Sequence, residues 1–171
     1  LNILRARGVK IVGHTESLEY NSLYRLYKLD VIDFFDHLYT IEDNHNLHPN
    51  PKNAKVIPVK DDFIIRLSSA ESKPNPKLLE HICLTENVDI KNAIYVGDSI
   101  TKDISMAKSI GMKAVWACYG RQFAPELWEI LVKITHWTDK DVEREEQLKE
   151  SFSRVKPDYS INSFAEILDL K

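Results

Sequence analysis

Cysteine is scarce in this sequence, basic charge is not in excess, and long apolar runs are missing. The two cysteines, Cys83 and Cys118, lie far apart in apolar surroundings and without metal-type spacing, so we expect reduced core thiols in a cytosolic protein. No apolar run could span a membrane, and no secretory hydrophobic region follows the cationic start Leu1–Lys10. The sequence therefore predicts a cytoplasmic protein with no membrane partner.

The charge balance and the first residues narrow the range of functions further. A formal net charge of −3 gives no basic footprint, so we expect no nucleic-acid partner. With 43% apolar and 29% charged residues, the 171-residue chain fits a single domain with a sizeable core rather than a disordered or fibrous protein. The chain does not begin with Met, and Leu1–Gly8 has the pattern of the last turns of a helix closed by a glycine. We therefore expect a preceding amino-terminal segment or a second chain.

Strand-like and helix-like patterns alternate along the chain. This alternation predicts an α/β fold, a Rossmann-like parallel sheet with helices on both faces, in one domain over residues 1–171. The expected strands are 9–15, a short strand ending at 41, 93–97, 113–117 and 157–162, and the expected helices are 17–29, 76–83, 100–110, 125–134, a charged helix from 138, and 163–170.

The stretch Ala93–Asp103 is the centre of the functional argument. A buried-strand pattern breaks at Gly97 and resumes as a helix that Gly111 is expected to end. Asp98 is therefore expected at the carboxyl end of the strand, where open α/β sheets bind ligands. Asp103 follows within the first helical turn. Two neighbouring carboxylates repel each other unless a cation lies nearby, and hard oxygen ligands suit Mg²⁺. The alternative is a plain strand-to-helix turn in which Asp98 or Ser99 is only an N-cap.

A second polar position at a strand end is Thr15. It ends the apolar run that starts at Val9 and precedes the helical pattern that begins at about Ser17. A hydroxyl and backbone N–H groups at such a junction can hold a phosphate oxygen. An N-cap without a ligand is the alternative.

The segment Lys73-Pro74-Asn75-Pro76 introduces the next helix. Pro74 favours an extended Lys73, Asn75 is expected to cap the helix, and Pro76 is expected at its first position. Lys73 would then be held in place and presented to an anion. A surface lysine before a proline-capped helix is the alternative.

Residues 42–72 interrupt the alternation and are rich in Asn, His, Pro and Lys. Two β-like runs, 56–59 and 63–67, indicate an inserted flap or hairpin. The histidines His45 and His48 lack a strong metal-binding spacing, which favours surface histidines. The candidate anion contacts of this flap are His48, Lys55 and Lys60.

Taken together and in their order along the chain, Thr15, Lys73–Pro76 and Gly97–Asp103 resemble motifs of the haloacid dehalogenase-like (HAD) hydrolase superfamily. The apolar strand that ends at Thr15 resembles its second motif, Lys73–Pro76 its third, and Gly97–Asp103 its fourth. The sequences Ala107–Met112 and Pro157–Leu168 are also similar to those around and after the fourth motif. The resemblance covers nearly the whole chain apart from the insertion and the region before the last strand.

The resemblance implies a Mg²⁺-dependent phosphohydrolase that acts on a small phosphorylated metabolite through an aspartyl-phosphate intermediate. Thr15 and Lys73 would be catalytic, and Thr15, Glu16 and Lys73 would bind the substrate. Asp98 and Asp103 would hold the metal, or Asp103 would orient Lys73. A lysine in this role neutralises charge shared between the nucleophile and the phosphoryl group.

One departure from the family pattern concerns the first motif. That motif is an Asp-x-Asp pair whose first Asp is the nucleophile, and it should precede Thr15, but residues 1–14 contain neither Asp nor Glu. We therefore expect the first strand and the cap domain to lie outside this chain, and the chain alone to be inactive. Two rival interpretations are a non-catalytic binding or interaction module on the same fold and a metal-independent haloacid dehalogenase.

Overall fold

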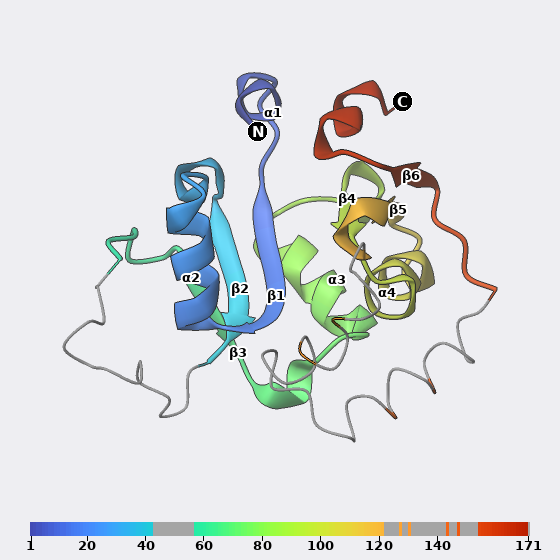
Figure 1. Cartoon of the computed structure of the whole chain (residues 1–171), viewed down its shortest axis with the longest axis horizontal. Helices are drawn as coiled ribbons and strands as arrows, with labels where there is room; N and C mark the ends of the chain where they lie inside the picture. Colours follow the sequence, from blue (N-terminus) through green and yellow to red (C-terminus); the bar gives the residue numbers. More distant parts are fainter. Residues whose placement is uncertain are drawn as a thin grey trace. The chain divides into compact units, whose positions relative to one another are not determined.

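A computed structural model describes residues 1–42, 57–121 and 154–170, together with positions 127, 130, 143 and 147. The chain divides into two compact units, Leu1–Ser72 and Lys73–Lys171 (Figure 1). Each unit contains a three-stranded sheet, and every strand pair in both sheets is parallel.

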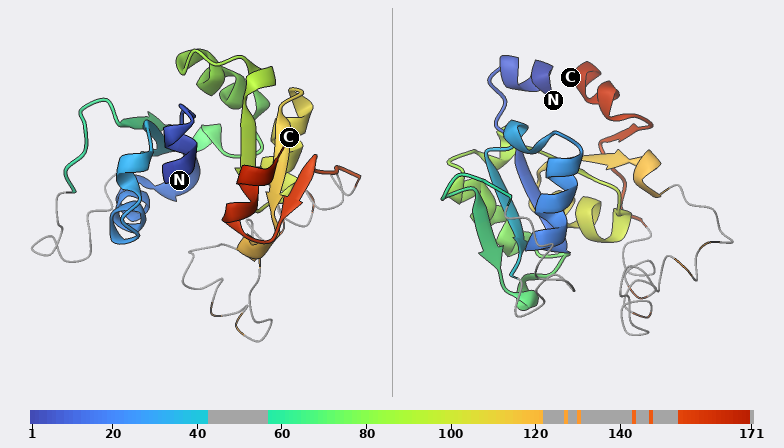
Figure 2. Two further views of the ribbon diagram at one scale, coloured as in Figure 1. Left: turned by 90° about the horizontal axis from the view of Figure 1, so that it is seen from above. Right: turned by 60° about the vertical axis from the view of Figure 1, so that its left-hand side comes forward.

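The first unit is built on the sheet β1-β2-β3. Helix α2 follows β1 directly and packs on the sheet, as Figure 1 and Figure 2 show in blue. Leu23 on α2 belongs to a buried cluster with Leu38 of β2 and Phe63, the residue before β3. The elements are α1 (Asn2–Ala6), β1 (Val12–Leu18), α2 (Glu19–Lys28), η1 (Ile32–Phe34), β2 (His37–Ile41), β3 (Ile64–Leu67) and η3 (Ser69–Glu71).

The second unit is built on the sheet β4-β5-β6. Its first helix begins as expected, because Pro76 is its first residue and the side chain of Asn75 accepts a hydrogen bond from the backbone N–H of Leu78 at 3.1 Å. The elements are α3 (Pro76–Thr85), η4 (Ile90–Asn92), β4 (Ile94–Gly97), η5 (Ile100–Ile104), α4 (Ser105–Ser109), β5 (Lys113–Ala117), η6 (Cys118–Arg121), β6 (Tyr159–Ile161) and η8 (Phe164–Asp169).

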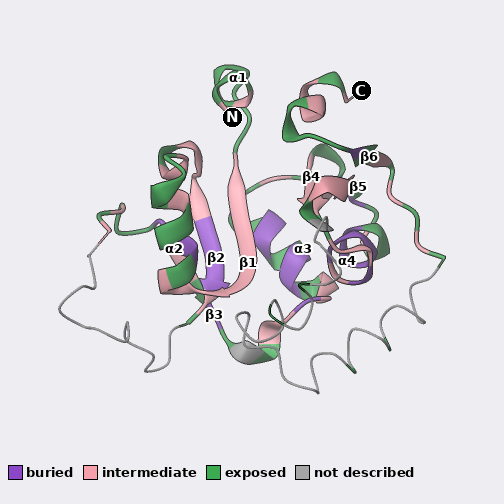
Figure 3. Cartoon of the chain, viewed as in Figure 1, coloured by how far each residue is buried: buried purple, intermediate pink, exposed green. Residues whose placement is uncertain are grey.

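The core of the second unit lies where α3 and α4 pack together over the sheet. Leu79 of α3 contributes to it together with Ile104, Ala107 and Ala114, and these last three are fully buried (Figure 3). Because Ile104 and Ala107 flank the junction between η5 and α4, packing fixes the turn that connects β4 to these helices. This turn carries the candidate functional residues.

The parallel sheets with flanking helices confirm the expected α/β Rossmann-like class. Both predicted glycine stops are confirmed as well. Gly8 follows α1 at φ 75° and Gly111 follows α4 at φ 76°, a backbone region that glycine adopts without strain. The expectation of a single domain with an inserted flap stays a prediction.

Two expectations for the first unit are wrong in detail. The strand that carries Thr15 does not end there, because β1 continues to Leu18 before α2 begins. The hairpin is also wrong, because residues 57–59 form no strand and β3 pairs in parallel with β2. A short apolar run predicts a strand but not the direction of its neighbour, which explains the second error.

Several expectations lie outside the described residues, namely the helices at 125–134 and from 138, and the side chains of His45, His48 and Lys55. Lys60 is described and exposed. Of the two free cysteines, Cys83 is buried as expected, whereas Cys118 is partly exposed. Among the residues that the structure describes, no helix is both long and apolar enough to cross a membrane.

Candidate functional site

The turn between β4 and α4 is a π-helical turn that Ser99 begins. The Ser99 hydroxyl accepts a hydrogen bond from the backbone N–H of Lys102 at 3.2 Å, and the Ser99 carbonyl accepts from the N–H groups of Asp103 and Ile104 at 2.9 and 3.1 Å. The bond to Ile104 spans five residues, which is the π-type spacing. Residue 99 is thus both an N-cap and the acceptor that closes the turn.

Asp103 folds back from η5 against the end of β4. Its Oδ2 accepts a hydrogen bond from the backbone N–H of Ser99 at 3.1 Å. A Cβ at Gly97 would lie 2.5 Å from the Asp103 Cγ, closer than real contacts allow. Glycine is therefore required at position 97 because the Asp103 carboxyl group occupies the space of a side chain.

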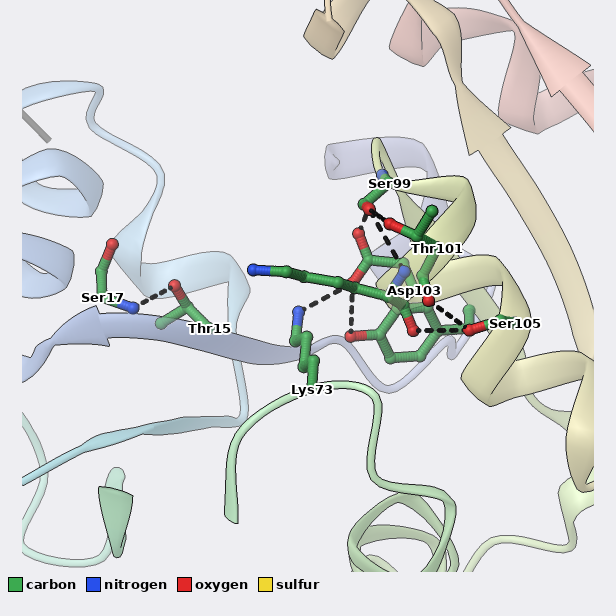
Figure 4. Close-up of polar contacts among 9 residues, drawn as sticks. Thr15, Ser17, Lys73, Ser99, Thr101, Asp103 and Ser105 are labelled. Atoms are coloured by element: carbon green, nitrogen blue, oxygen red, sulfur yellow. Dashed lines mark hydrogen bonds and ion pairs between the residues drawn. The ribbon is translucent and has the colours of Figure 1, made fainter. Parts of the chain in front are cut away.

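Lys73 forms a buried ion pair with Asp103. The Lys73 Nζ donates to Asp103 Oδ1 at 2.9 Å, and the two side chains are 11% and 7% exposed (Figure 4). Burial of the ammonium would lower its pKa, but the negative charge of Asp103 and the hydrogen bonds to Asp103 and Tyr95 outweigh this, so the pKa of Lys73 is raised above its ordinary value. Lys73 is therefore cationic at neutral pH.

Hydroxyl groups surround the same turn. Ser99 Oγ and Thr101 Oγ1 are 3.0 Å apart, and Ser105 Oγ donates to the Thr101 carbonyl at 2.6 Å (Figure 4). Thr101 and Ser105 are buried. These bonds tie the π turn to the first turn of α4 and hold the backbone that carries Asp98 and Asp103.

Asp98 differs from Asp103 in being exposed. The Asp98 backbone carbonyl accepts a hydrogen bond from Trp116 Nε1 at 2.9 Å. A Cβ placed at Gly120 would lie 2.6 Å from the Asp98 Cβ. Burial and the nearby Asp98 carboxylate raise the pKa of Tyr119. The end of β5 and the following η6 turn therefore fix the position of Asp98.

Thr15 lies in the first unit, within an irregular part of β1. The parallel register with β2 is regular up to His14, which faces Tyr39, and resumes at Leu18, which faces Ile41. Between them, Thr15 Oγ1 accepts a hydrogen bond from the backbone N–H of Ser17 at 3.1 Å (Figure 4). This bond leaves the hydroxyl hydrogen of Thr15 able to donate.

The residues around Thr15 hold this irregular segment in place. The Thr40 hydroxyl donates to the Ser17 carbonyl at 2.7 Å, and the Arg25 side chain donates to the Ser17 hydroxyl at 3.3 Å. Glu16 is half-buried within the same segment. The predicted substrate-binding residues Thr15 and Glu16 thus share one irregular strand end.

Within the second unit the structure brings Lys73 and Asp103 together and places Asp98 five residues earlier on the same turn. In the part of the chain that is described, no group of three or more His, Cys, Asp or Glu side chains could hold a metal ion. Magnesium is often held by one or two carboxylates and completes its shell with water and phosphate oxygens. The exposed Asp98 carboxylate fits such a partial site.

The sequence pattern assigns no role to Tyr95 or Gly120, although Tyr95 contacts Asp103 and Gly120 lies against Asp98. A signal for Tyr95 was present, because side chains alternate along a strand and Tyr95 therefore shares a face of β4 with Gly97. Gly120 gave no comparable signal, since its closeness to Asp98 depends on the pairing of β4 with β5.

The fold and the site define an α/β protein with a charged cluster at the carboxyl end of a parallel strand. The family model for haloacid dehalogenase-like hydrolases matches residues 55–117. The glyceraldehyde 3-phosphate phosphatase of Pyrococcus abyssi is 28% identical over 118 residues, which cover 69% of this chain and 39% of that protein. The glyceraldehyde 3-phosphate phosphatase of Pyrococcus furiosus is 42% identical over 65 residues, or 36% of this chain and 27% of that protein.

A solved structure agrees in fold. The HAD phosphatase from Thermococcus onnurineus aligns with a TM-score of 0.56 at 21% identity, covering 98% of this chain and 53% of that one. Residues 55–117 and the two Pyrococcus relatives thus make the chain similar to haloacid dehalogenase-like hydrolases. It spans less than half the length of the two Pyrococcus relatives that it matches.

Proposed function

We propose that this chain is part of a phosphohydrolase that acts on a small phosphorylated metabolite. The observation that carries the proposal is the buried Lys73–Asp103 ion pair next to the exposed Asp98 at the end of β4. A buried charge pair adds little to stability compared with apolar packing, so a cationic lysine held in this way is better explained by an anionic ligand. Phosphoryl groups carry such a charge, and their transfer depends on positioned cations.

Each of the proposed site residues has a separate role. Lys73 neutralises charge shared by the attacking group and the phosphoryl oxygens. Asp103 orients Lys73, because its Oδ1 accepts from Lys73 and its Oδ2 from the Ser99 N–H. Thr15 donates its hydroxyl to a phosphoryl oxygen, and Glu16 lies beside it in the substrate-binding segment.

Magnesium is the cofactor that this site fits. Asp98 would hold the ion, whereas both oxygens of Asp103, the second carboxylate of the predicted pair, already accept hydrogen bonds from Lys73 and the Ser99 N–H. When bound, the ion supplies positive charge that offsets the repulsion between an anionic nucleophile and a phosphate. The exposed carboxylate of Asp98 supports the proposal, because magnesium in such sites keeps water and substrate oxygens as ligands.

The nucleophile is proposed to be an aspartate outside these 171 residues. It would attack phosphorus while the P–O bond to the substrate's alcohol breaks and the alcohol leaves, and water would then hydrolyse the aspartyl-phosphate, releasing inorganic phosphate and restoring the aspartate. The absence of acidic residues from positions 1–14 supports this, because the family's nucleophile motif precedes Thr15. The chain alone is therefore proposed to bind ligands without turning them over. Glyceraldehyde 3-phosphate is the first substrate to test, since both Pyrococcus relatives are named glyceraldehyde 3-phosphate phosphatase.

The test measures phosphate release from para-nitrophenyl phosphate and glyceraldehyde 3-phosphate by the full-length natural protein, with and without Mg²⁺. We expect metal-dependent turnover that Asp98→Asn reduces by at least about a hundredfold. Asp169→Asn makes the same chemical change at an exposed position in η8 and should leave turnover unaltered.

Binding to the 171-residue chain provides a second readout. Calorimetric titration should show Mg²⁺ binding that Asp98→Asn weakens and Asp169→Asn does not. If the full-length protein neither turns over phosphate esters nor binds Mg²⁺ or phosphate, the proposal is wrong and the non-catalytic module becomes the better interpretation. Turnover that Mg²⁺ does not affect would instead refute the metal assignment.

A further inference from the structure

Tyr95 lies in the middle of β4, two residues before Gly97. Its position places it on the strand face against which Asp103 packs. We propose that Tyr95 is a positioning residue for Lys73, holding the ammonium group through its ring and, through its hydroxyl, the carboxylate that pairs with it. This inference rests on the proposed function, because it assigns the orientation of the phosphate-neutralising lysine to a further residue.

Two donors, from Lys73 and Tyr95, meet at one carboxylate oxygen of Asp103. Asp103 Oδ1 accepts from Lys73 Nζ at 2.9 Å and from the Tyr95 hydroxyl at 3.4 Å. The Lys73 Nζ also lies 5.5 Å from the centre of the Tyr95 ring, within the range of a cation–π interaction. Tyr95 therefore touches both members of the ion pair, and neither can move without losing a contact to it.

The chemistry of these contacts favours a fixed lysine. A lysine has a long flexible side chain that ends in a compact charge with three donors, and its hydrogen bond to Asp103 is one constraint on the position of that charge. A ring face adds a second, non-rotating constraint on the position of the charge. Burial raises the pKa of Tyr95, so its hydroxyl keeps its proton at neutral pH and remains a donor to Asp103.

The first unit contains a second lysine–tyrosine contact, which serves as a control for the contact between Lys73 and Tyr95. Lys28 Nζ lies 5.6 Å from the centre of the Tyr24 ring, nearly the same separation as in the Lys73–Tyr95 contact. Tyr24 is 43% exposed and Lys28 is exposed as well. Tyr24→Phe therefore makes the same chemical change beneath a solvated lysine.

The first experiment observes the lysine directly. In the chain labelled with ¹⁵N-lysine, we expect a slowly exchanging ammonium signal that Lys73→Met removes and thereby assigns. Tyr95→Phe should speed its proton exchange several-fold or shift it, whereas Tyr24→Phe should leave it unchanged. Tyr95→Leu, which removes the ring as well, should have the larger effect. The backbone amide spectrum checks that each variant is folded.

The second experiment measures catalysis by the full-length protein. Tyr95→Phe should lower kcat by about tenfold to a hundredfold with little change in KM, as expected for a misplaced charge-neutralising group. Tyr24→Phe should leave both constants unchanged. An active protein in which Tyr95→Phe keeps its full kcat would overturn the positioning role.

The two experiments distinguish a failure of the positioning role from a failure of the proposed function. If Tyr95→Phe and Tyr95→Leu, both folded, leave the Lys73 signal unaltered, Tyr95 does not position Lys73, whatever the protein catalyses. If the wild-type protein lacks phosphatase activity but Tyr95→Phe changes the Lys73 signal, the proposed function fails while the hold of Tyr95 on Lys73 stands.

Discussion

Two lysine–aspartate pairs in the second unit show how much burial changes the meaning of the same contact. Lys73 and Asp103 are 11% and 7% exposed at a separation of 2.9 Å, and Lys108 and Asp158 are 37% and 32% exposed at 2.7 Å. Breaking a buried pair leaves an uncompensated charge away from water. Breaking an exposed pair leaves both groups solvated.

This contrast gives a prediction for single substitutions. Lys73→Met should lower the free energy of unfolding by about 3–5 kcal/mol, because the Asp103 carboxylate stays buried without its cation. Lys108→Met should lower it by less than about 1 kcal/mol. Urea unfolding followed by circular dichroism measures both changes.

The double variant Lys73→Met with Asp103→Asn provides the control, because asparagine keeps an acceptor oxygen for the Ser99 N–H. It removes both charges, so it should recover most of the stability that Lys73→Met loses. If the double variant is as unstable as the sum of its two single variants, the pair does not interact as described.

At the scale of residues, the sequence predicted the acidic turn and the lysine but not their contact. Asp98 and Asp103 could be placed on one turn because they are close in sequence. Lys73 lies 30 positions before Asp103, and their pairing depends on how α3 packs against α4. Tyr95 was missed because a tyrosine in a strand is more often simply part of the core.

At the scale of elements, Asp158 fastens the start of β6. Its Oδ1 accepts from Lys108 Nζ at 2.7 Å and its Oδ2 from the backbone N–H of Ala114 at 2.8 Å. It thereby links the last strand to α4 and to β5. The hydrogen bonds from Lys108 and Ala114 lower the pKa of Asp158 below its ordinary value.

The lowered pKa predicts a pH-dependent contribution of Asp158. A carboxyl group with a lowered pKa in the folded state stabilises the fold fully above its unfolded pKa, and this contribution is lost as pH falls through the folded value. Asp158→Asn should therefore be less stable than wild type at pH 7, and the difference should shrink as pH falls below about 4. Urea unfolding across pH 7 to 3 measures it.

A matched variant separates this effect from general acid unfolding. Asp169→Asn changes an exposed carboxylate of η8 and should show the same small difference from wild type at every pH. A constant gap between Asp158→Asn and wild type from pH 7 to 3 would contradict the assigned role.

Helix caps and strands were predictable where the residues that specify them are neighbours in the sequence. The caps at Asn75 and Gly111 and the strand β5 follow from neighbouring residues and were placed correctly. The end of β1 was placed too early, because the polar residues after His14 read as a turn although β1 continues past them to Leu18. The hairpin failed because strand direction depends on a partner that is distant in sequence.

At the scale of the whole molecule, the alternation of strands and helices was sufficient to predict the α/β class. In each unit a described helix joins two parallel strands, α2 between β1 and β2 and α4 between β4 and β5, and each unit buries its own apolar cluster. The placement of Thr15 in one unit and of Lys73, Asp98 and Asp103 in the other follows the order of the motifs.

The proposal that the nucleophile lies outside these residues predicts how the 171-residue chain behaves when it is expressed alone. It should bind Mg²⁺ through the second unit without releasing phosphate from para-nitrophenyl phosphate, because its proposed nucleophile lies elsewhere. The full-length protein measured in parallel is the control. Metal-dependent turnover by the isolated chain, abolished by Asp98→Asn, would show that the nucleophile lies within these residues.

The hydrogen bond from the Trp116 indole to the carbonyl of Asp98 has an optical consequence. Indole fluorescence responds to the polarity and hydrogen bonding around the ring, so Trp116 is a built-in reporter at the proposed metal position. The sequence has three tryptophans, so a variant with Trp128→Phe and Trp137→Phe would retain only Trp116. The remaining emission would then follow ligand binding at Asp98 in real time without an attached dye.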